Sequence, residues 1–140
     1  MSILNPYLNF VDNAREAIEF YHAVFGGDLA VSTFADFGAP VEPAEAHLVM
    51  HAQLDTPAGY TIMASDTPSH IAMPEGAKAF SVSLSGENSE KAELSGYFEK
   101  LAEGGTVDQP LGSSPWGATF GMLTDRFGVS WLVNIAGPQA

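Results

Sequence analysis

The stretch LNPYLNFVDNAREAIEFYHAVFGG, residues 4–27, decides the fold. Its first seven residues place Leu4, Leu8 and Phe10 on one face and polar side chains on the other, which is typical of a half-buried strand. Asn13 then stands at an N-cap position with Glu16 three residues later, a pattern that predicts a helix closed by a capping box. Apolar side chains recur at helical spacing until Gly26-Gly27, where the helix should end.

The second half of the chain repeats this order. Residues 80–85 alternate between apolar side chains and serine, and a helical pattern covers residues 89–103. Gly104-Gly105 then follow, 78 residues after Gly26-Gly27. An ordered recurrence of strand, helix and stop indicates an internal repeat, and such a repeat governs the fold.

The remaining patterns complete each half as β-α-β-β-β. The loops should cover residues 36–44 and 109–115, and the strand before the second loop should be short. We therefore expect one domain over residues 1–140, with module 1 at 3–66, a linker at 67–78 and module 2 at 79–135. The strands after each helix are expected at residues 29–35, 45–54, 60–65, 106–108, 117–124 and 129–134.

Composition excludes several classes of partner. The chain has 5 Lys and Arg against 17 Asp and Glu, a formal net charge of −12, which disfavours nucleic acid and anionic membranes. Cysteine is absent, so disulfides and thiolate metal sites are excluded. The first residues lack the basic and long apolar regions of a signal peptide, and no apolar run approaches the ~20 residues of a membrane span. We expect a cytoplasmic protein.

One helix per half should cover one face of each sheet, which predicts an α+β fold. If the mixed sheets curl, their opposite faces form a cleft with polar and apolar walls, the usual setting of a ligand site. The side chains expected on these faces are Tyr7, Asn9, His47, His51, Met63, Ser65, Ser81, Ser83, Ser130 and Asn134.

His51 is the candidate general base, because it stands mid-strand where a cleft would be deepest. His47 is four residues away on the same face, about 13 Å in a strand, so the two cannot share one ion. The alternative is that both are polar wall or surface histidines. Tyr7 and Asn9 could orient a ligand carbonyl or hydroxyl, or could instead form cross-strand hydrogen bonds.

Three aromatic side chains could form a wall for a planar ligand. They are Trp116, Phe120 and Trp131, and Trp116 is the better binding candidate because it lies beside Gly117 in a turn-rich loop. Trp131 shares a strand face with Val129 and Val133, which predicts a place in the core. The alternative for all three is core packing or a dimer contact.

Five segments together resemble the vicinal oxygen chelate superfamily, which includes glyoxalase I, bleomycin-resistance proteins and extradiol dioxygenases, and within it the PhnB-like subgroup. The resemblance covers residues 4–134 and is most specific over 116–134. It implies tandem βαβββ modules, curled sheets around a cleft, and a homodimer. The segments are NPYLNF (5–10), AIEFYHAVFGG (17–27), MASD (63–66), WGATFG (116–121) and DRFGVSWLVN (125–134).

Metal-dependent members of that family place His or Glu on the first and last strand of each module. The corresponding positions here are Pro6 or Tyr7, Met63 or Ala64, Ser81 or Ser83, and Leu132. Leucine cannot bind a metal and serine is a weak neutral donor, so the resemblance implies no complete metal site. No cofactor is predicted, and the methyltransferase label that some PhnB-like proteins carry has no nucleotide-binding loop to support it.

The leading hypothesis is a protein that binds a small organic molecule in a dimer cleft. Its alternative is a metal-assisted lyase, isomerase or dioxygenase of the same superfamily that acts on a small oxygenated substrate. His51 would then be the base, or one ligand of an incomplete divalent-metal site. A structural or regulatory dimer without a ligand is a third interpretation. The predicted ligand contacts are Tyr7, Asn9, His51, Met63, Ser65, Ser83, Trp116 and Phe120.

Overall fold

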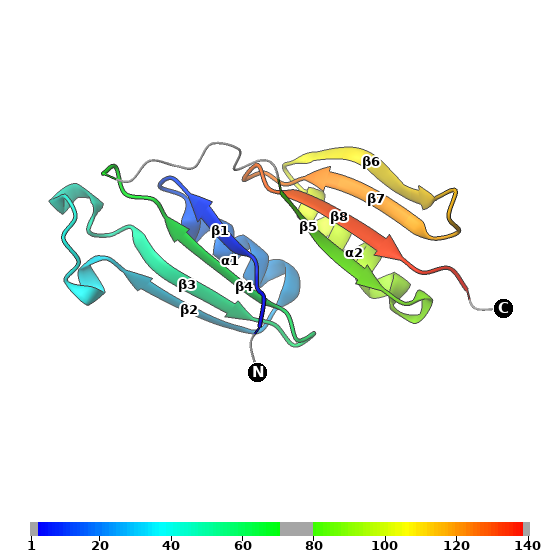
Figure 1. The fold of residues 1–140 in the computed structure, drawn as a ribbon, viewed down its shortest axis with the longest axis horizontal. Coiled ribbons are helices and arrows are strands. Elements are labelled where there is room, and N and C mark those ends of the chain that lie inside the picture. The colour runs from blue at the N-terminus through cyan, green and yellow to red at the C-terminus, as the bar shows by residue number, and fades with distance from the viewer. Residues whose placement is uncertain (1–2, 71–79, 139–140) are drawn as a thin grey trace. The chain divides into compact units, whose positions relative to one another are not determined.

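The computed structural model describes residues 3–70 and 80–138. The chain divides into two compact units, residues 1–75 and 76–140, and each has the order β-α-β-β-β (Figure 1). The first unit contains β1 (Tyr7–Phe10), α1 (Ala14–Phe25), β2 (Asp28–Thr33), β3 (Val49–Asp55) and β4 (Thr61–Asp66). The second contains β5 (Ser81–Gly86), α2 (Lys91–Ala102), β6 (Thr106–Ser113), β7 (Thr119–Thr124) and β8 (Ser130–Ile135).

Both units have the same sheet topology. The strand orders are β1-β4-β3-β2 and β5-β8-β7-β6, with the first strand parallel to the last and the other pairs antiparallel. Short 3-10 turns lie at Ala35–Phe37 (η1), Pro43–Glu45 (η2) and Asn88–Glu90 (η3). The α+β class and the tandem modules predicted from the repeat are therefore confirmed. Of the predicted linker at 67–78, residues 71–78 lie outside the described residues.

Each helix lies against one face of its own sheet (Figure 1). The alternating strand patterns direct their apolar residues beneath it, so each unit has its own core. Figure 1 shows the sheets as twisted and less curled than the sequence had suggested. The largest fully buried side chains are Trp131, Tyr21, Ile18, Leu54, Leu94, Leu101, Leu123, Ile135, Val49 and Val133.

The second glycine of each Gly-Gly pair makes the same kind of close packing contact in its own unit. A Cβ on Gly27 would lie 2.1 Å from the backbone oxygen of Asp55, and a Cβ on Gly105 would lie 2.3 Å from that of Thr124. Both oxygens belong to the last residue of a strand, β3 or β7, at the start of a hairpin turn. In each unit the chain leaving the helix therefore passes so close to this turn that only glycine fits. The repeat is structural as well as sequential.

The predicted capping box at the start of α1 is wrong. The Asn13 side chain makes no capping bond. Instead Asp66, at the far end of β4 and only 3% exposed, accepts from the backbone N–H of Ala14 at 2.9 Å. Its second oxygen accepts from the backbone N–H of Val49 at 2.9 Å. One buried carboxylate thus joins helix α1 to strand β3, a link that no local pattern could reveal.

Several predicted strand boundaries also move, two of them by four residues or more. β6 runs from Thr106 to Ser113, through the predicted loop at 109–115, because its pairing with β7 is interrupted by bulges and not ended. Pro110 is tolerated there because β6 is an edge strand. β3 begins at Val49 and not at residue 45, since Pro43–Glu45 form the 3-10 turn η2.

We predict that Asp66→Ala lowers the free energy of unfolding by about 2–4 kcal/mol, because two buried N–H groups lose their acceptor. Asn13→Ala is the matched control. Its side chain makes no capping bond, so its effect should stay within about 0.5 kcal/mol. Urea unfolding of both variants measures the difference. A larger loss in Asn13→Ala than in Asp66→Ala would contradict the assignment of the cap.

Gly105→Ala should be among the most destabilising single substitutions in the chain. A methyl group would overlap the Thr124 carbonyl and require the β7–β8 turn to move, which costs about 3 kcal/mol or more. Gly96, inside α2, has open space where a Cβ would lie, with nothing within 4 Å, so Gly96→Ala should instead stabilise by about 0.5–1 kcal/mol. Opposite changes in thermal midpoint are expected, and equal changes would refute the close approach at Gly105.

Candidate functional site

Each sheet has a face turned away from its helix, and these two faces carry the candidate site residues. We call the face of the β1-β4-β3-β2 sheet the first open face, and that of the β5-β8-β7-β6 sheet the second open face. Burial alternates along β4 and β8, where every second residue is buried beneath the helix and the others are half-buried. The open faces are therefore set by strand period and by the presence of one helix per sheet.

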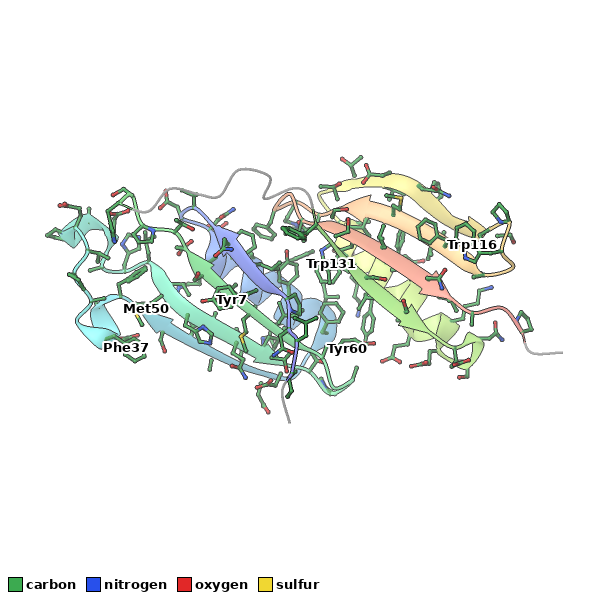
Figure 2. All side chains as sticks on the ribbon, viewed as in Figure 1. Tyr7, Phe37, Met50, Tyr60, Trp116 and Trp131 are labelled. Atoms are coloured by element: carbon green, nitrogen blue, oxygen red, sulfur yellow. The ribbon has the colours of Figure 1, made fainter. Side chains whose placement is uncertain are left out.

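The first open face brings together Tyr7 and His51 from strands that are not neighbours. Tyr7 pairs with Met63 across the parallel β1–β4 ladder, and Asn9 pairs with Ser65. The Tyr7 hydroxyl lies 3.3 Å from His51 Nδ1, and the two ring centroids are 5.8 Å apart. Figure 2 shows the Tyr7 side chain on this face. Five predicted contact residues thus share one surface.

The Tyr7–His51 contact defines what this face can do. When the Tyr7 hydroxyl donates to Nδ1, the proton of a neutral imidazole resides on Nε2, which is then a donor toward a ligand. When Nδ1 carries the proton, Nε2 becomes an acceptor and a candidate base. Tyr7 is 45% exposed, so its ring also offers an aromatic surface. The pair can therefore orient an oxygenated ligand or move a proton.

The second open face carries an ordered aromatic pair near its β6–β7 hairpin. Trp116 Nε1 donates to Asn134 Oδ1 at 3.2 Å, and the Trp116 ring meets Phe120 nearly edge-on at 5.4 Å between centroids. The hairpin itself is closed by Ser114, whose hydroxyl donates to the Ala118 carbonyl at 2.7 Å. Trp116 is nevertheless 62% exposed. It is a large aromatic side chain held in place and left uncovered (Figure 2).

The rest of the second open face changes in character along the strands. Its middle row consists of Ser83, Leu132, Met122 and Gln109, which pair across β5, β8, β7 and β6. At the far end the Ser81 hydroxyl donates to that of Ser130 at 2.8 Å. Next to this pair, Thr124 donates to the carboxylate of Asp108 at 2.8 Å. The face thus has an aromatic end, a middle row of two apolar and two polar side chains, and an opposite end with hydroxyl groups and one carboxylate.

The structure also separates residues that the sequence had grouped. Trp131 is 1% exposed and donates from Nε1 to the buried Asp125 at 2.9 Å, which confirms its predicted place in the core. His47 precedes β3 and takes no part in the Tyr7–His51 contact. Asn134 was expected on the open face but not as a partner of Trp116. That contact joins residues 18 apart, and alternation alone cannot reveal it.

Asp36 has a pKa that departs from its ordinary value. The backbone N–H of Thr33 donates to its carboxylate at 2.7 Å and holds the pKa of Asp36 below its usual range, with further help from the Thr33 side chain and the charge of Arg15. The Asp36 N–H in turn bonds the Thr33 hydroxyl at 3.2 Å. This reciprocal pair orders the start of the loop after β2.

The positions implied for metal ligands do not fit a metal ion. Tyr7 pairs with Met63 in the first unit, and Ser83 pairs with Leu132 in the second. A phenol, a thioether, a hydroxyl and an alkyl group do not make a donor set for a divalent cation. Within residues 3–70 and 80–138, no three His, Asp or Glu side chains gather closely enough to hold one.

The fold and these faces define a class of protein. Residues 3–133 match the family model of the glyoxalase/bleomycin resistance protein/dioxygenase superfamily, so the chain belongs to that superfamily. In the parts of the chain that the structure describes, no helix is long and apolar enough to cross a membrane.

Its relatives are PhnB-like proteins. The chain is 29% identical to protein YjdN of Escherichia coli K12, with 97% of each chain covered. It is 40% identical to the crystal structure of protein PA1353 from Pseudomonas aeruginosa, with a TM-score of 0.81 and 99% and 100% of the two chains covered. The PhnB protein from Bacillus cereus is 29% identical with a TM-score of 0.69, and 96% of this chain and 100% of that chain are covered.

The two tryptophans should be separable by fluorescence quenching. Trp116 is 62% exposed whereas Trp131 is 1% exposed, so acrylamide should quench about one of two emitters. Trp116→Phe should remove most of the accessible fraction while the unfolding midpoint changes little, because the ring lies on the surface. Full accessibility of the remaining Trp131 in that variant would contradict the described burial.

Proposed function

We propose that this PhnB-like protein binds a small organic molecule against its open sheet faces, as a cytoplasmic homodimer and without a complete metal site. The observation that carries the proposal is the pair of anchored, exposed aromatic side chains, Tyr7 on the first open face and Trp116 on the second. The proposed contacts are Tyr7, Asn9, His51, Met63, Ser65, Ser83, Trp116 and Phe120.

The anchoring supports a binding role. A side chain already held by a hydrogen bond loses little conformational freedom when a ligand docks, so more of the interaction energy becomes affinity. Both aromatic rings have such a bond, to His51 Nδ1 and Asn134 Oδ1 respectively. Around them, hydroxyl and amide groups supply directional donors and acceptors. A few fixed polar groups that orient the ligand are typical of small-molecule sites.

The dimer is supported by exposed apolar surface away from these residues. Leu4 is 99% exposed, Ile3 76% and Phe80 78%. Single exposed apolar side chains are ordinary, but three of this size beside edge strands β1 and β5 favour burial against another protein surface. A second copy of the chain would supply that surface.

Native mass spectrometry of the untagged protein tests the proposal, because it reports subunit number, metal and trapped organic molecules together. We expect a dimer that carries an organic adduct or no adduct, and no stoichiometric metal. One metal ion per chain that a chelator removes together with an activity would overturn the metal-independent function. A monomer at micromolar concentration would overturn the dimer.

A second candidate function is favoured by the Tyr7–His51 contact, which is suited to proton transfer. In this version the protein is a lyase, isomerase or dioxygenase acting on a small oxygenated substrate, with His51 as base or as one ligand of an incomplete metal site. His51→Ala would abolish turnover of such a substrate. Tyr7→Phe, which removes only the hydroxyl next to Nδ1, would reduce turnover of the same substrate.

If the protein is a binder and not an enzyme, the two variants behave differently. Both should weaken ligand binding by a factor of about 3–30, the range expected for one hydrogen bond, because each removes one partner of the pair. Isothermal titration with the molecule found by mass spectrometry measures this. An unchanged dissociation constant in both variants would remove the first open face from the site.

A further inference from the structure

We propose that Met50 and Asp66 are positioning residues for His51: Met50 is the extra residue of a β-bulge in β3, and the buried Asp66 carboxylate holds that bulge in place. The bulge sets where the His51 ring meets the Tyr7 hydroxyl. This inference rests on the proposed function only in treating His51 as a functional group. It follows from the register of two ladders, from the burial along β3, and from a comparison of the two modules.

The pairing of β3 with β2 contains one extra residue. Ser32 pairs with His51, yet the next residue of β2, Thr33, pairs with Val49. Met50, labelled in Figure 2, is therefore the extra residue of a β-bulge. Such a bulge bends its strand and increases the local twist, and bulges often re-aim a neighbouring side chain. Here the neighbouring side chain is that of His51.

Burial along β3 shows why the extra residue is needed. Val49 and Ala52 both lie in the core although they are three residues apart. Strict alternation would place residues at this spacing on opposite faces of the sheet. Met50 and His51, between them, are both half-buried. The bulge thus lets two core residues point the same way and leaves the two intervening side chains outside the core.

Pairing of β3 with β4 stops at the same place. β3 lies between β2 and β4 (Figure 1), and its ladder with β4 ends at the pair Ala52–Ala64, although β4 continues to Asp66. An unbroken register would pair His51 with Ser65 next. His51 is instead paired on its β2 side, and its ring lies against a residue of β1, on the far side of β4.

The second module shows the regular form of this region. There β7 and β8 pair over six residues, against four for β3 and β4. The bulges of the second sheet lie in the edge strand β6, so β7 stays regular. β8 ends on the buried Ile135, whereas β4 ends on the buried Asp66. The repeat therefore breaks where the first module has both an opened ladder and a carboxylate.

The Asp66 carboxylate closes this opening. One oxygen accepts from the backbone N–H of Val49 at 2.9 Å, directly before Met50, while the other caps α1. On the opposite strand, Asp36 accepts from the backbone N–H of Thr33 at 2.7 Å. Both strands are thus held next to the bulge by side-chain carboxylates. This confines the extra residue to one position along β3.

The consequence concerns the protonation pattern of one imidazole. The Tyr7 hydroxyl lies 3.3 Å from His51 Nδ1, and a hydroxyl that donates there leaves the proton of a neutral ring on Nε2. Removing the extra residue would straighten β3 and allow its ladder with β4 to continue through His51. The ring would then move relative to β1. One added residue in β3 therefore decides which nitrogen of His51 is the donor.

Nitrogen-15 NMR of the imidazole rings tests the inference, because the signals of Nδ1 and Nε2 report which nitrogen carries the proton. Spectra are recorded at about pH 8.5, where an ordinary imidazole is neutral, and His51→Gln assigns the signals. We expect Tyr7→Phe to shift the His51 signals in the otherwise unaltered protein. In a variant that lacks Met50, this response to Tyr7→Phe should be lost.

Met50→Ala is the matched control. It removes the side chain but keeps the extra backbone residue, so the response to Tyr7→Phe should remain complete. Asp66→Ala keeps every residue of the chain but leaves the Val49 N–H without its acceptor, and the response should again be lost. Circular dichroism shows which variants are folded, and Asp66→Ala decides the question if the deletion variant is not. A merely structural role would lower stability and leave the response intact.

The other outcomes overturn the inference. A complete response in the folded deletion variant, or in folded Asp66→Ala, shows that the bulge does not place the ring. Loss of the response in Met50→Ala assigns the effect to the methionine side chain and not to the extra residue. Absence of any response in the otherwise unaltered protein rejects the Tyr7–His51 contact. The native mass spectrum then decides separately whether the protein holds an organic molecule.

Discussion

Each four-stranded sheet has a single helix to cover it, so only one of its faces is buried within its own module. Much of the molecule follows from this constraint. The strands must alternate, with apolar residues beneath the helix and tolerant positions on the other side. The open faces are therefore free to carry Tyr7, His51, Asn134 and Trp116 without cost to the core. Function and folding use different residues of the same strands.

In each module, one buried carboxylate fixes neighbouring elements in place. Asp66 holds the start of α1 against β3, and Asp125 binds two backbone N–H groups of its own turn together with the indole of Trp131. Each is less than 5% exposed, so its hydrogen bonds form in surroundings where losing one is costly. The hairpin turns, which also receive the close glycine approach at Gly27 and Gly105, act as fixed points in each module.

The chain belongs to a superfamily with diverse chemistry. At the positions that the resemblance implies for metal ligands, however, its open faces carry other side chains. The pairs Tyr7–Met63 and Ser83–Leu132 occupy the positions where such ligands would stand. What these faces offer instead is aromatic surface, hydrogen-bonding hydroxyl, amide and imidazole groups, and one carboxylate, that of Asp108. Such a surface is suited to selective binding, and the contact of Tyr7 with His51 adds one group able to transfer a proton.

The sequence by itself determined the repeat, the α+β class, the family resemblance and the face on which most candidate residues lie. These depend on the local spacing of apolar and polar residues, which is the same wherever a strand or helix packs. The sequence also distinguished Trp131 from Trp116 correctly, because Trp131 lies on the apolar face of a strand and Trp116 lies in a turn. Tertiary structure alone decided the contacts between distant residues: Asp66 as the cap of α1, Tyr7 against His51, and Trp116 on Asn134. Strand order and register set these contacts, and both are outcomes of packing that no local pattern contains.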